Sequence, residues 1–169
     1  MMNKEKKIKN GFTLIEMIVS VAIITIGVLG VFSVITNYSQ KTQQQEERLI
    51  ATYLCQEGIE IVRNIRDTNW VNGDNWSDGL NSCTSALGGC EADFDYSDLD
   101  SYYDDHYLYI QNSSGAYLYP FYSTVDVKTP FRRKIIITPD GSDELDVQVD
   151  VYWMDHTMTI YENFYNWKP

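Results

Sequence analysis

The chain has 169 residues and carries 13 Lys and Arg residues against 24 Asp and Glu residues, which gives a net charge of −11. This length suits one folded domain of ordinary size. A strongly acidic surface repels DNA, so direct binding of nucleic acid through general phosphate contacts is not expected. Aromatic residues make up 14% of the chain, which argues against disorder. Only one stretch is apolar enough to span a bilayer, which excludes a protein with several membrane spans.

The apolar stretch runs from Leu14 to Ile35, and its only charged residue is Glu16. As a helix it would cover about 33 Å, enough to cross the hydrocarbon core of a membrane. Acidic residues follow it, and four lysines precede it: Lys4, Lys6, Lys7 and Lys9. We therefore expect a single pass through the cytoplasmic (inner) membrane, with the N-terminus inside and the rest of the chain outside.

Hydropathy alone leaves two simple interpretations, a cleaved secretory signal and an uncleaved signal anchor. A secretory signal has an apolar run of about 7 to 15 residues followed by a cleavage site of the A-x-A kind. This run is longer, and the segment TNYSQKTQQQ after it has no such site. Of the two, a plain membrane anchor therefore fits the sequence better.

The string KNGFTLIEM, from Lys9 to Met17, indicates more than a plain anchor. It resembles the processing motif of type IV prepilins and of the related pseudopilins of type II secretion and competence systems. The resemblance implies that a membrane-embedded prepilin peptidase cuts between Gly11 and Phe12 and that Phe12 is then N-methylated. Thr13 and Glu16 match the family's FTLIE pattern, and Glu16 takes its acidic position, so both are expected to serve assembly.

Two effects can offset the cost of placing the Glu16 carboxylate at the start of a membrane-spanning helix. The helix dipole favours a negative charge in the first turn by about 0.3 to 1 kcal/mol. Cleavage after Gly11 would also create an ammonium group on Phe12, with which Glu16 of a neighbouring subunit could pair. The joint occurrence of leader and acid favours this second explanation.

Beyond the apolar run, helical spacing continues through an amphipathic segment. Its predicted apolar stripe consists of Ile50, Leu54, Ile61 and Ile65, with Leu49, Tyr53 and Val62 beside them. One helix from about Phe12 to Arg66 is expected, stopped by Asp67, Thr68 and Asn69. The predicted organisation is a basic leader (1–11), a transmembrane and assembly half-helix (12–36), an amphipathic half-helix (37–68) and an extracytoplasmic β-rich head (69–169).

The C-terminal part alternates between strand-like runs and turn signals such as Pro139-Asp140-Gly141. The strand-like runs are YLYI, AYLYPFYSTVDV, PFRRKIIITP, ELDVQVDVYWM and TMTIYENFYNW. Alternation is clearest between Leu145 and Trp153, where odd-numbered residues should face the core and even-numbered ones water. The predicted fold is α+β, with an antiparallel sheet packed on the second half of the long helix. The resemblance to pilins implies the same fold.

Cys83 and Cys90 flank the short loop TSALGG, in a part of the chain expected outside the cytoplasm. Such a compartment favours a disulfide over two free thiols. Cys55 lies one residue from the helix's apolar stripe and is expected to be a buried small hydrophobic residue rather than a reactive thiol.

Seven acids lie between Glu91 and Asp105, and four of them, Asp93, Asp95, Asp98 and Asp100, could gather oxygen ligands for Ca²⁺. Because the segment lacks the EF-hand pattern, a solvated acidic loop is the default expectation and no metal site is predicted. The surrounding tyrosines, Tyr102, Tyr103, Tyr107, Tyr109, Tyr117, Tyr119 and Tyr122, fit a half-buried sheet better than a recognition patch.

Enzyme motifs are missing from the sequence: there is no G-x-S-x-G, GxxxxGK[ST], H-E-x-x-H or C-x-x-C. His106 and His156 are the only side chains with an ordinary pKa near neutrality, and both are expected at the surface. No catalytic residue and no cofactor are predicted. An anchored extracytoplasmic enzyme is the weakest of the alternatives.

The sequence therefore predicts a structural subunit of a type IV pilus-like, type II secretion or competence filament. Its segments VAIITIGVLG and QEGIEIVRNIRDTNW look more like those of minor pilins than of major ones. Expected partners are the prepilin peptidase, other pilin or pseudopilin subunits, the inner-membrane assembly platform and membrane lipid. The alternative is an uncleaved signal-anchored binding protein whose acidic, Tyr-rich head holds Ca²⁺ or another ligand.

Overall fold

A computed structural model describes residues 11–93, 99–111, 114–118 and 127–167. The chain divides into two compact units, one up to Glu46 and one from Glu47 onward. Helix α1 (Leu14–Asn72) belongs to both. Within the described residues it is followed by the short 3-10 helix η1 (Ser85–Leu87) and eight strands. The strands are β1 (Cys90–Glu91), β2 (Asp100–Ser101), β3 (Tyr109–Ile110), β4 (Tyr117–Leu118), β5 (Val127–Lys128), β6 (Phe131–Asp140), β7 (Glu144–Trp153) and β8 (His156–Tyr165).

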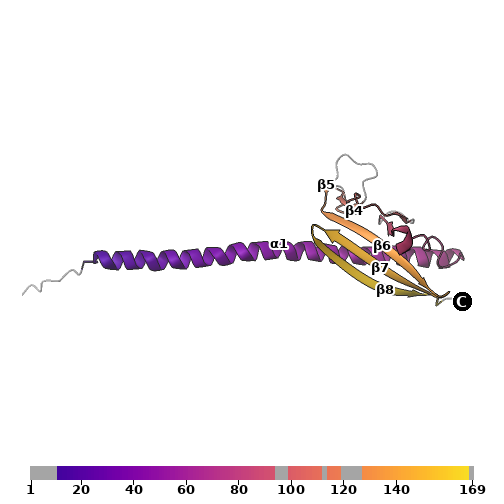
Figure 1. Cartoon of the computed structure of the whole chain (residues 1–169), viewed down its shortest axis with the longest axis horizontal. Helices are drawn as coiled ribbons and strands as arrows, with labels where there is room; N and C mark the ends of the chain where they lie inside the picture. The colour runs from indigo at the N-terminus through magenta and orange to yellow at the C-terminus, as the bar shows by residue number, and fades with distance from the viewer. Residues whose placement is uncertain (1–10, 94–98, 112–113, 119–126, 168–169) are drawn as a thin grey trace, which may run out of the picture. The chain divides into compact units, whose positions relative to one another are not determined.

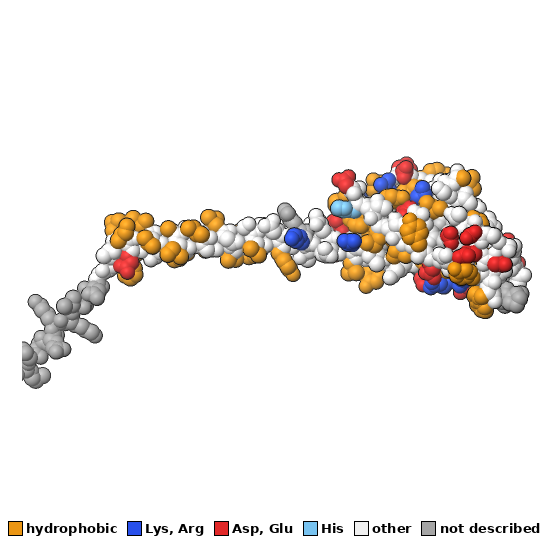
Figure 2. Space-filling view, turned by 60° about the horizontal axis from the view of Figure 1, so that its bottom comes forward, with side chains coloured by type: hydrophobic (Ala, Val, Ile, Leu, Met, Phe, Trp, Pro, Cys, Tyr) orange, Lys and Arg blue, Asp and Glu red, His pale blue; other side chains and the backbone are white. Residues whose placement is uncertain are grey.

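The first unit is the N-terminal part of α1. Its large apolar side chains are all exposed within the unit, as Figure 2 shows along the helix surface. By length and composition this part of the helix can cross a membrane. Exposure of so long an apolar surface to water is unfavourable, so we expect lipid or neighbouring helices to cover it.

The part of the second unit that the structure describes contains two antiparallel sheets. The larger has the strand order β2-β1-β6-β7-β8, and the smaller has the order β4-β3-β5. The long strands β6, β7 and β8 lie beside the C-terminal half of α1 (Figure 1). Their pairing runs without interruption, β6 with β7 from Phe131↔Trp153 to Asp140↔Glu144 and β7 with β8 over all ten residues. The predicted α+β arrangement is confirmed.

Alternation along β7 follows the prediction on one face and departs from it on the other. The odd-numbered residues Leu145 to Trp153 are all buried in the core. Asp150, predicted to face water, is also buried, because neighbouring side chains surround its carboxylate. Gln148 and Thr159 donate hydrogen bonds to it at 2.9 and 2.7 Å, and Tyr152 donates a third at 3.2 Å. A buried carboxylate persists because such bonds replace its hydration.

Helix α1 continues to Asn72, six residues beyond the predicted end at Arg66. Asp67, Thr68 and Asn69 have modest helix propensity but do not stop it. The end comes at Gly73, whose φ of +81° is left-handed, and the Asp74 N–H reaches back to the Asn69 carbonyl at 2.9 Å. This is the Schellman arrangement, for which glycine is the preferred residue. The side chain of Asn69 instead ties the following loop to the helix, donating to the carbonyls of Trp76 and Asp78.

The helix face that meets the sheet is centred on small residues. Ala51, Cys55 and Gly58 are buried at spacings of four and three, with Leu54, Ile59, Ile61, Val62 and Ile65 around them. Leu49 and Tyr53, predicted beside the stripe, are exposed instead. The prediction followed the large apolar residues and therefore placed the stripe to one side of its true centre.

Gly58 marks the closest approach between helix and sheet. A Cβ atom there would lie 2.8 Å from Val149 Cγ1 and 3.2 Å from Arg133 Cδ. Both neighbours are fully buried, so neither has free space into which to move. The absence of a side chain at this position therefore sets the distance between α1 and the sheet.

We expect Gly58→Ala to lower the free energy of unfolding of the head by about 1–2 kcal/mol. Overpacking costs about 1–3 kcal/mol, and the better helix propensity of alanine returns up to about 1 kcal/mol. The measurement is urea unfolding of the full chain in detergent micelles, followed by tryptophan fluorescence, because all four tryptophans lie beyond Asn69.

A double-mutant cycle with Val149→Ala is the control for this prediction, since that change opens space where the new Cβ must fit. The cost of Gly58→Ala should shrink in the Val149→Ala background. Equal costs in both backgrounds would show that close approach to Val149 is not the reason.

Candidate functional site: the N-terminal segment

The predicted processing and assembly residues occupy the first described part of the chain. Apart from its chain neighbours, no described residue has an atom within 4 Å of where a Cβ of Gly11 would lie, and Phe12 is 73% exposed. Both precede α1, which begins at Leu14. The bond between Gly11 and Phe12 therefore lies in an accessible, non-helical stretch, the form in which a peptidase can take up its substrate.

Thr13 and Glu16 form a reciprocal cap at the start of α1. The Thr13 hydroxyl oxygen accepts a hydrogen bond from the Glu16 N–H at 3.4 Å. In return, Glu16 Oε2 accepts from the Thr13 N–H at 3.5 Å and from the Thr13 hydroxyl at 3.4 Å. This is a capping box, which satisfies backbone donors that a helix start leaves unpaired. This cap was not predicted from the sequence, where the helix dipole was the one local effect expected to stabilise Glu16, although T-x-x-E is the usual pattern of a capping box.

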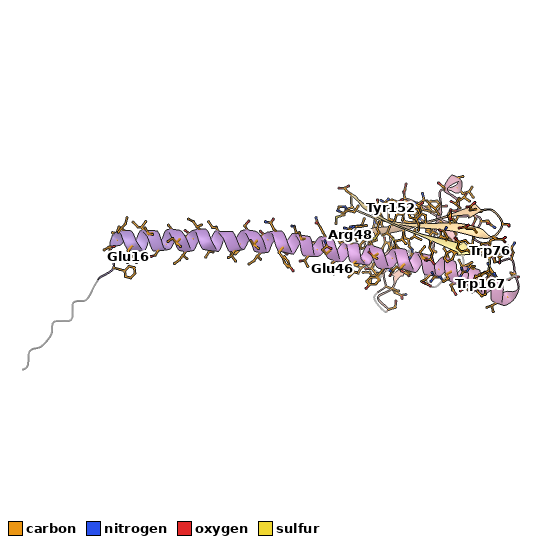
Figure 3. All side chains as sticks on the ribbon, turned by 90° about the horizontal axis from the view of Figure 1, so that it is seen from below. Glu16, Glu46, Arg48, Trp76, Tyr152 and Trp167 are labelled. Atoms are coloured by element: carbon orange, nitrogen blue, oxygen red, sulfur yellow. A yellow bond between two sulfur atoms is a disulfide. The ribbon has the colours of Figure 1, made fainter. Side chains whose placement is uncertain are left out.

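The carboxylate of Glu16 thus lies one turn from the residue that cleavage would make N-terminal. Figure 3 shows Glu16 at the beginning of the helix. Both intrachain bonds use Oε2. An ionised carboxylate has about four acceptor positions, so the capping box leaves capacity for a further donor.

Comparison with protein families matches residues 6–32 to the prokaryotic N-terminal methylation motif. The segment is a prepilin-type signature. It supports a type IV pilin-like or pseudopilin subunit in general terms, and proteins with this motif are structural rather than catalytic. The motif implies processing by a prepilin peptidase and assembly with other pilins, and with the apolar helix it indicates membrane anchoring. Neither the curated proteins nor the solved structures contain a match to this chain.

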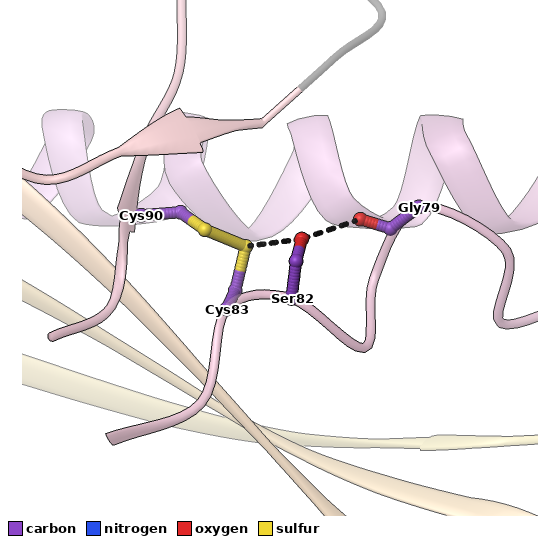
Figure 4. The surroundings of a disulfide bond; sticks show 4 residues. All are labelled: Gly79, Ser82, Cys83 and Cys90. Atoms are coloured by element: carbon purple, nitrogen blue, oxygen red, sulfur yellow. Dashed lines mark hydrogen bonds between the residues drawn. A yellow bond between two sulfur atoms is a disulfide. The ribbon is translucent and has the colours of Figure 1, made fainter. Parts of the chain in front are cut away.

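The head contains the predicted disulfide between Cys83 and Cys90. Both residues are buried, and Figure 4 shows Ser82 beside the bond, with its hydroxyl 3.9 Å from Cys83 Sγ. Strand β6 holds both ends of the loop, because the Ile137 N–H donates to the Cys83 carbonyl at 2.8 Å and Cys90 pairs with Ile135. The disulfide therefore closes a loop whose two ends both pair with β6.

The acidic segment is only partly the solvated loop that was expected, since Asp100, Asp104 and Asp105 are exposed but two other acids are not. Glu91 and Asp93 are buried, while Asp95 and Asp98 lie outside the described residues. Burial raises the pKa of the Glu91 carboxyl, and the hydrogen bond with His106 at 2.6 Å opposes that rise. His106 is consequently half-buried rather than a surface side chain, whereas His156 is exposed. Within the described ranges, no group of three or more His, Cys, Asp or Glu residues could hold a metal ion.

Among the predicted tyrosines, Tyr102, Tyr107, Tyr109 and Tyr117 are half-buried, which fits the structural explanation. Tyr103 is exposed and stacks obliquely near His106, with ring centroids 4.8 Å apart. Tyr119 and Tyr122 lie outside the described residues.

Arg133 is the important side chain that the sequence analysis missed. It is fully buried on the inner face of β6. Its Nη1 lies 3.0 Å from Glu57 Oε2 and donates to the Leu54 carbonyl at 3.2 Å, while Nη2 donates to the Ala92 carbonyl at 2.5 Å. One guanidinium group therefore connects the sheet, the helix and the segment after β1. Its inward position follows from alternation with Phe131 and Ile135, a signal that was available in the sequence.

Cys55 is the free cysteine of the described chain, and it is buried at the helix–sheet contact. Burial raises the pKa of its thiol from 9.0 to about 12. The thiolate is the reactive form, so the native thiol should be inert at neutral pH. Because the folded pKa lies above the unfolded one, Cys55 contributes stability that is present below pH 9 and is lost as the pH rises toward 12.

We expect Cys55 to resist alkylation by iodoacetamide at pH 8 in the folded chain and to react completely once the chain is unfolded in urea. Intact mass measures the labelled fraction, and the disulfide leaves Cys55 as the single reactive position. Labelling of the folded chain at the rate of the unfolded chain would contradict the buried placement.

Proposed function

We propose that this chain is a structural subunit, a minor pilin or pseudopilin, of a type IV pilus-like, type II secretion or competence filament. The observation that carries the proposal is the prepilin signature, which runs into a capped, exposed apolar helix. The peptidase would cut between Gly11 and Phe12, and Phe12 would be methylated. The head would lie outside the cytoplasmic membrane, and the lysine-rich leader would lie inside, as the charge distribution favours.

In this proposal, Glu16 guides assembly through its charge. The new ammonium group of Phe12 on one subunit would pair with the Glu16 carboxylate of a neighbour. Thr13 would hold that carboxylate in a defined direction through the capping box. Less side-chain conformational entropy would then be lost when the neighbouring subunit binds. Such a pair sets the axial register of packed helices because it lies in lipid, where an unpaired charge is costly.

Glu16→Gln separates the intersubunit pair from the local cap. A capping box accepts Gln in place of Glu, so the variant keeps the local hydrogen bonds and loses only the negative charge. We expect at least a tenfold loss of the chain from sheared filaments, with unchanged amounts in the membrane. Immunoblots of the two fractions from the native host measure both quantities.

Glu46→Gln is the matched control, because it removes one exposed carboxylate from the same helix far along the chain from Thr13 (Figure 3). It should enter filaments normally. Normal incorporation of Glu16→Gln would contradict the assembly role and leave Glu16 with the helix cap alone.

A further inference from the structure

A pocket of about 520 Å³ lies where three separate segments of the head meet beyond the C-terminal end of α1. Trp70 comes from the last turn of the helix, and Ser142 from the turn between β6 and β7. Asn166 follows β8. The remaining lining residues, Gly73, Asp74, Asn75 and Trp76, belong to the turn after the helix. The volume falls in the range of about 300–1,000 Å³ that small-molecule sites occupy.

An exposed indole stands at this end of the head. Trp167 is 69% exposed, and Figure 3 shows it at the same end as Trp76. Its ring meets the edge of Trp70, with centroids 4.8 Å apart and the planes at 68°. Trp70 is supported in turn by the guanidinium group of Arg66, 4.6 Å from its ring centroid. Trp167 does not line the pocket itself, but it contacts Trp70, which does, so an exposed indole lies beside the pocket.

The backbone around the pocket is fixed before any ligand arrives. On the helix side, the left-handed Gly73 and the side chain of Asn69 hold the turn. On the sheet side, Asn166 donates to Asp143 twice, from its N–H to the carbonyl at 2.8 Å and from Nδ2 to the carboxylate at 3.3 Å. A preformed site avoids the cost of ordering loops on binding.

The lining chemistry combines tryptophan with uncharged and acidic polar groups. Asp74, Asn75, Ser142 and Asn166 supply carboxylate, amide and hydroxyl groups, and the residues that line the pocket include no Lys, Arg or His. Amide and hydroxyl groups both donate and accept hydrogen bonds. An anionic ligand would meet Asp74 and a chain of net charge −11. A purely apolar ligand would take the Asp74 carboxylate and the Ser142 hydroxyl out of water without offering them a hydrogen bond, which costs affinity.

A pyranose ring matches this combination, because it has an apolar C–H face for an indole and a rim of hydroxyl groups for amides and carboxylates. We propose that this pocket binds a neutral saccharide unit. The pocket lies beyond Asn72, about 40 Å of helix away from Glu47, where the chain enters the head unit. The proposal does not depend on processing or on filament assembly.

The test uses the full chain in micelles of an amine oxide detergent, since maltoside and glucoside detergents would compete for the site. The probes are the trisaccharides of glucose, mannose, galactose and N-acetylglucosamine, each up to 10 mM. Saturation-transfer NMR detects binding without relying on tryptophan emission. We expect at least one of them to bind with a Kd below about 1 mM, and sialyllactose to bind more weakly because of its charge.

Two variants locate the site. Trp167→Ala removes an exposed ring near the chain end, and Asp74→Ala removes a lining carboxylate; each should weaken binding of the same trisaccharide at least tenfold. Tyr161→Ala is the matched control, since Tyr161 is also 69% exposed but lies within β8, whereas Trp167 contacts the lining residue Trp70. Binding should survive it unchanged. Failure of all four trisaccharides to bind at 10 mM, or binding that Trp167→Ala leaves intact, would overturn the proposal.

Discussion

The close approach of α1 to the sheet at Gly58 is the constraint on which the head depends. Helix and sheet are in contact there through a position with no side chain, against the fully buried Val149. This short distance lets the Arg133 guanidinium on β6 reach the Leu54 carbonyl and the Glu57 carboxylate on the helix. A buried guanidinium is costly unless it is fully engaged, so the bonds to Arg133 also favour one register of helix on sheet over its neighbours.

The same helix carries both the prepilin signature and this packing face. Residues 6–32 match the methylation motif, and the face from Ala51 to Ile65 packs on the head. The two parts differ in how their apolar residues are distributed around the helix. In the first, apolar residues cover the whole surface, as expected of a helix in lipid, while in the second they are confined to one side. The apolar pattern of the first part ends at Ile35, eleven residues before the boundary between the two compact units at Glu46.

Sequence reasoning succeeded where a pattern has one physical cause. The alternation of β7 predicted its buried face because strand side chains point to opposite sides of a sheet. The expected position of the head outside the cytoplasm predicted the disulfide, because such a compartment favours disulfide formation. It failed where a residue's role depends on contacts from elsewhere in the chain. Asp150 is buried because Gln148, Tyr152 and Thr159 surround it, and Glu91 because His106 comes back to it from 15 positions further along.

The candidate site shows the same division. The proposed leader, cleavage position and assembly acid lie in one contiguous string, and the family comparison matches a motif that covers most of it. The capping box between Thr13 and Glu16 and the left-handed Gly73 also had local signals, which the sequence analysis did not use. The pocket near Trp167 had none, because residues more than ninety positions apart meet there.

The most direct test of this account is the N-terminus of the mature chain. The chain would be coexpressed with a prepilin peptidase, extracted from membranes, and examined by intact mass and terminal sequencing, with Gly11→Val as the control. The account predicts a chain that begins at methylated Phe12 and an uncut control. A chain that still begins at Met1 in the presence of active peptidase would contradict it, and would leave a membrane-anchored head that works without a filament.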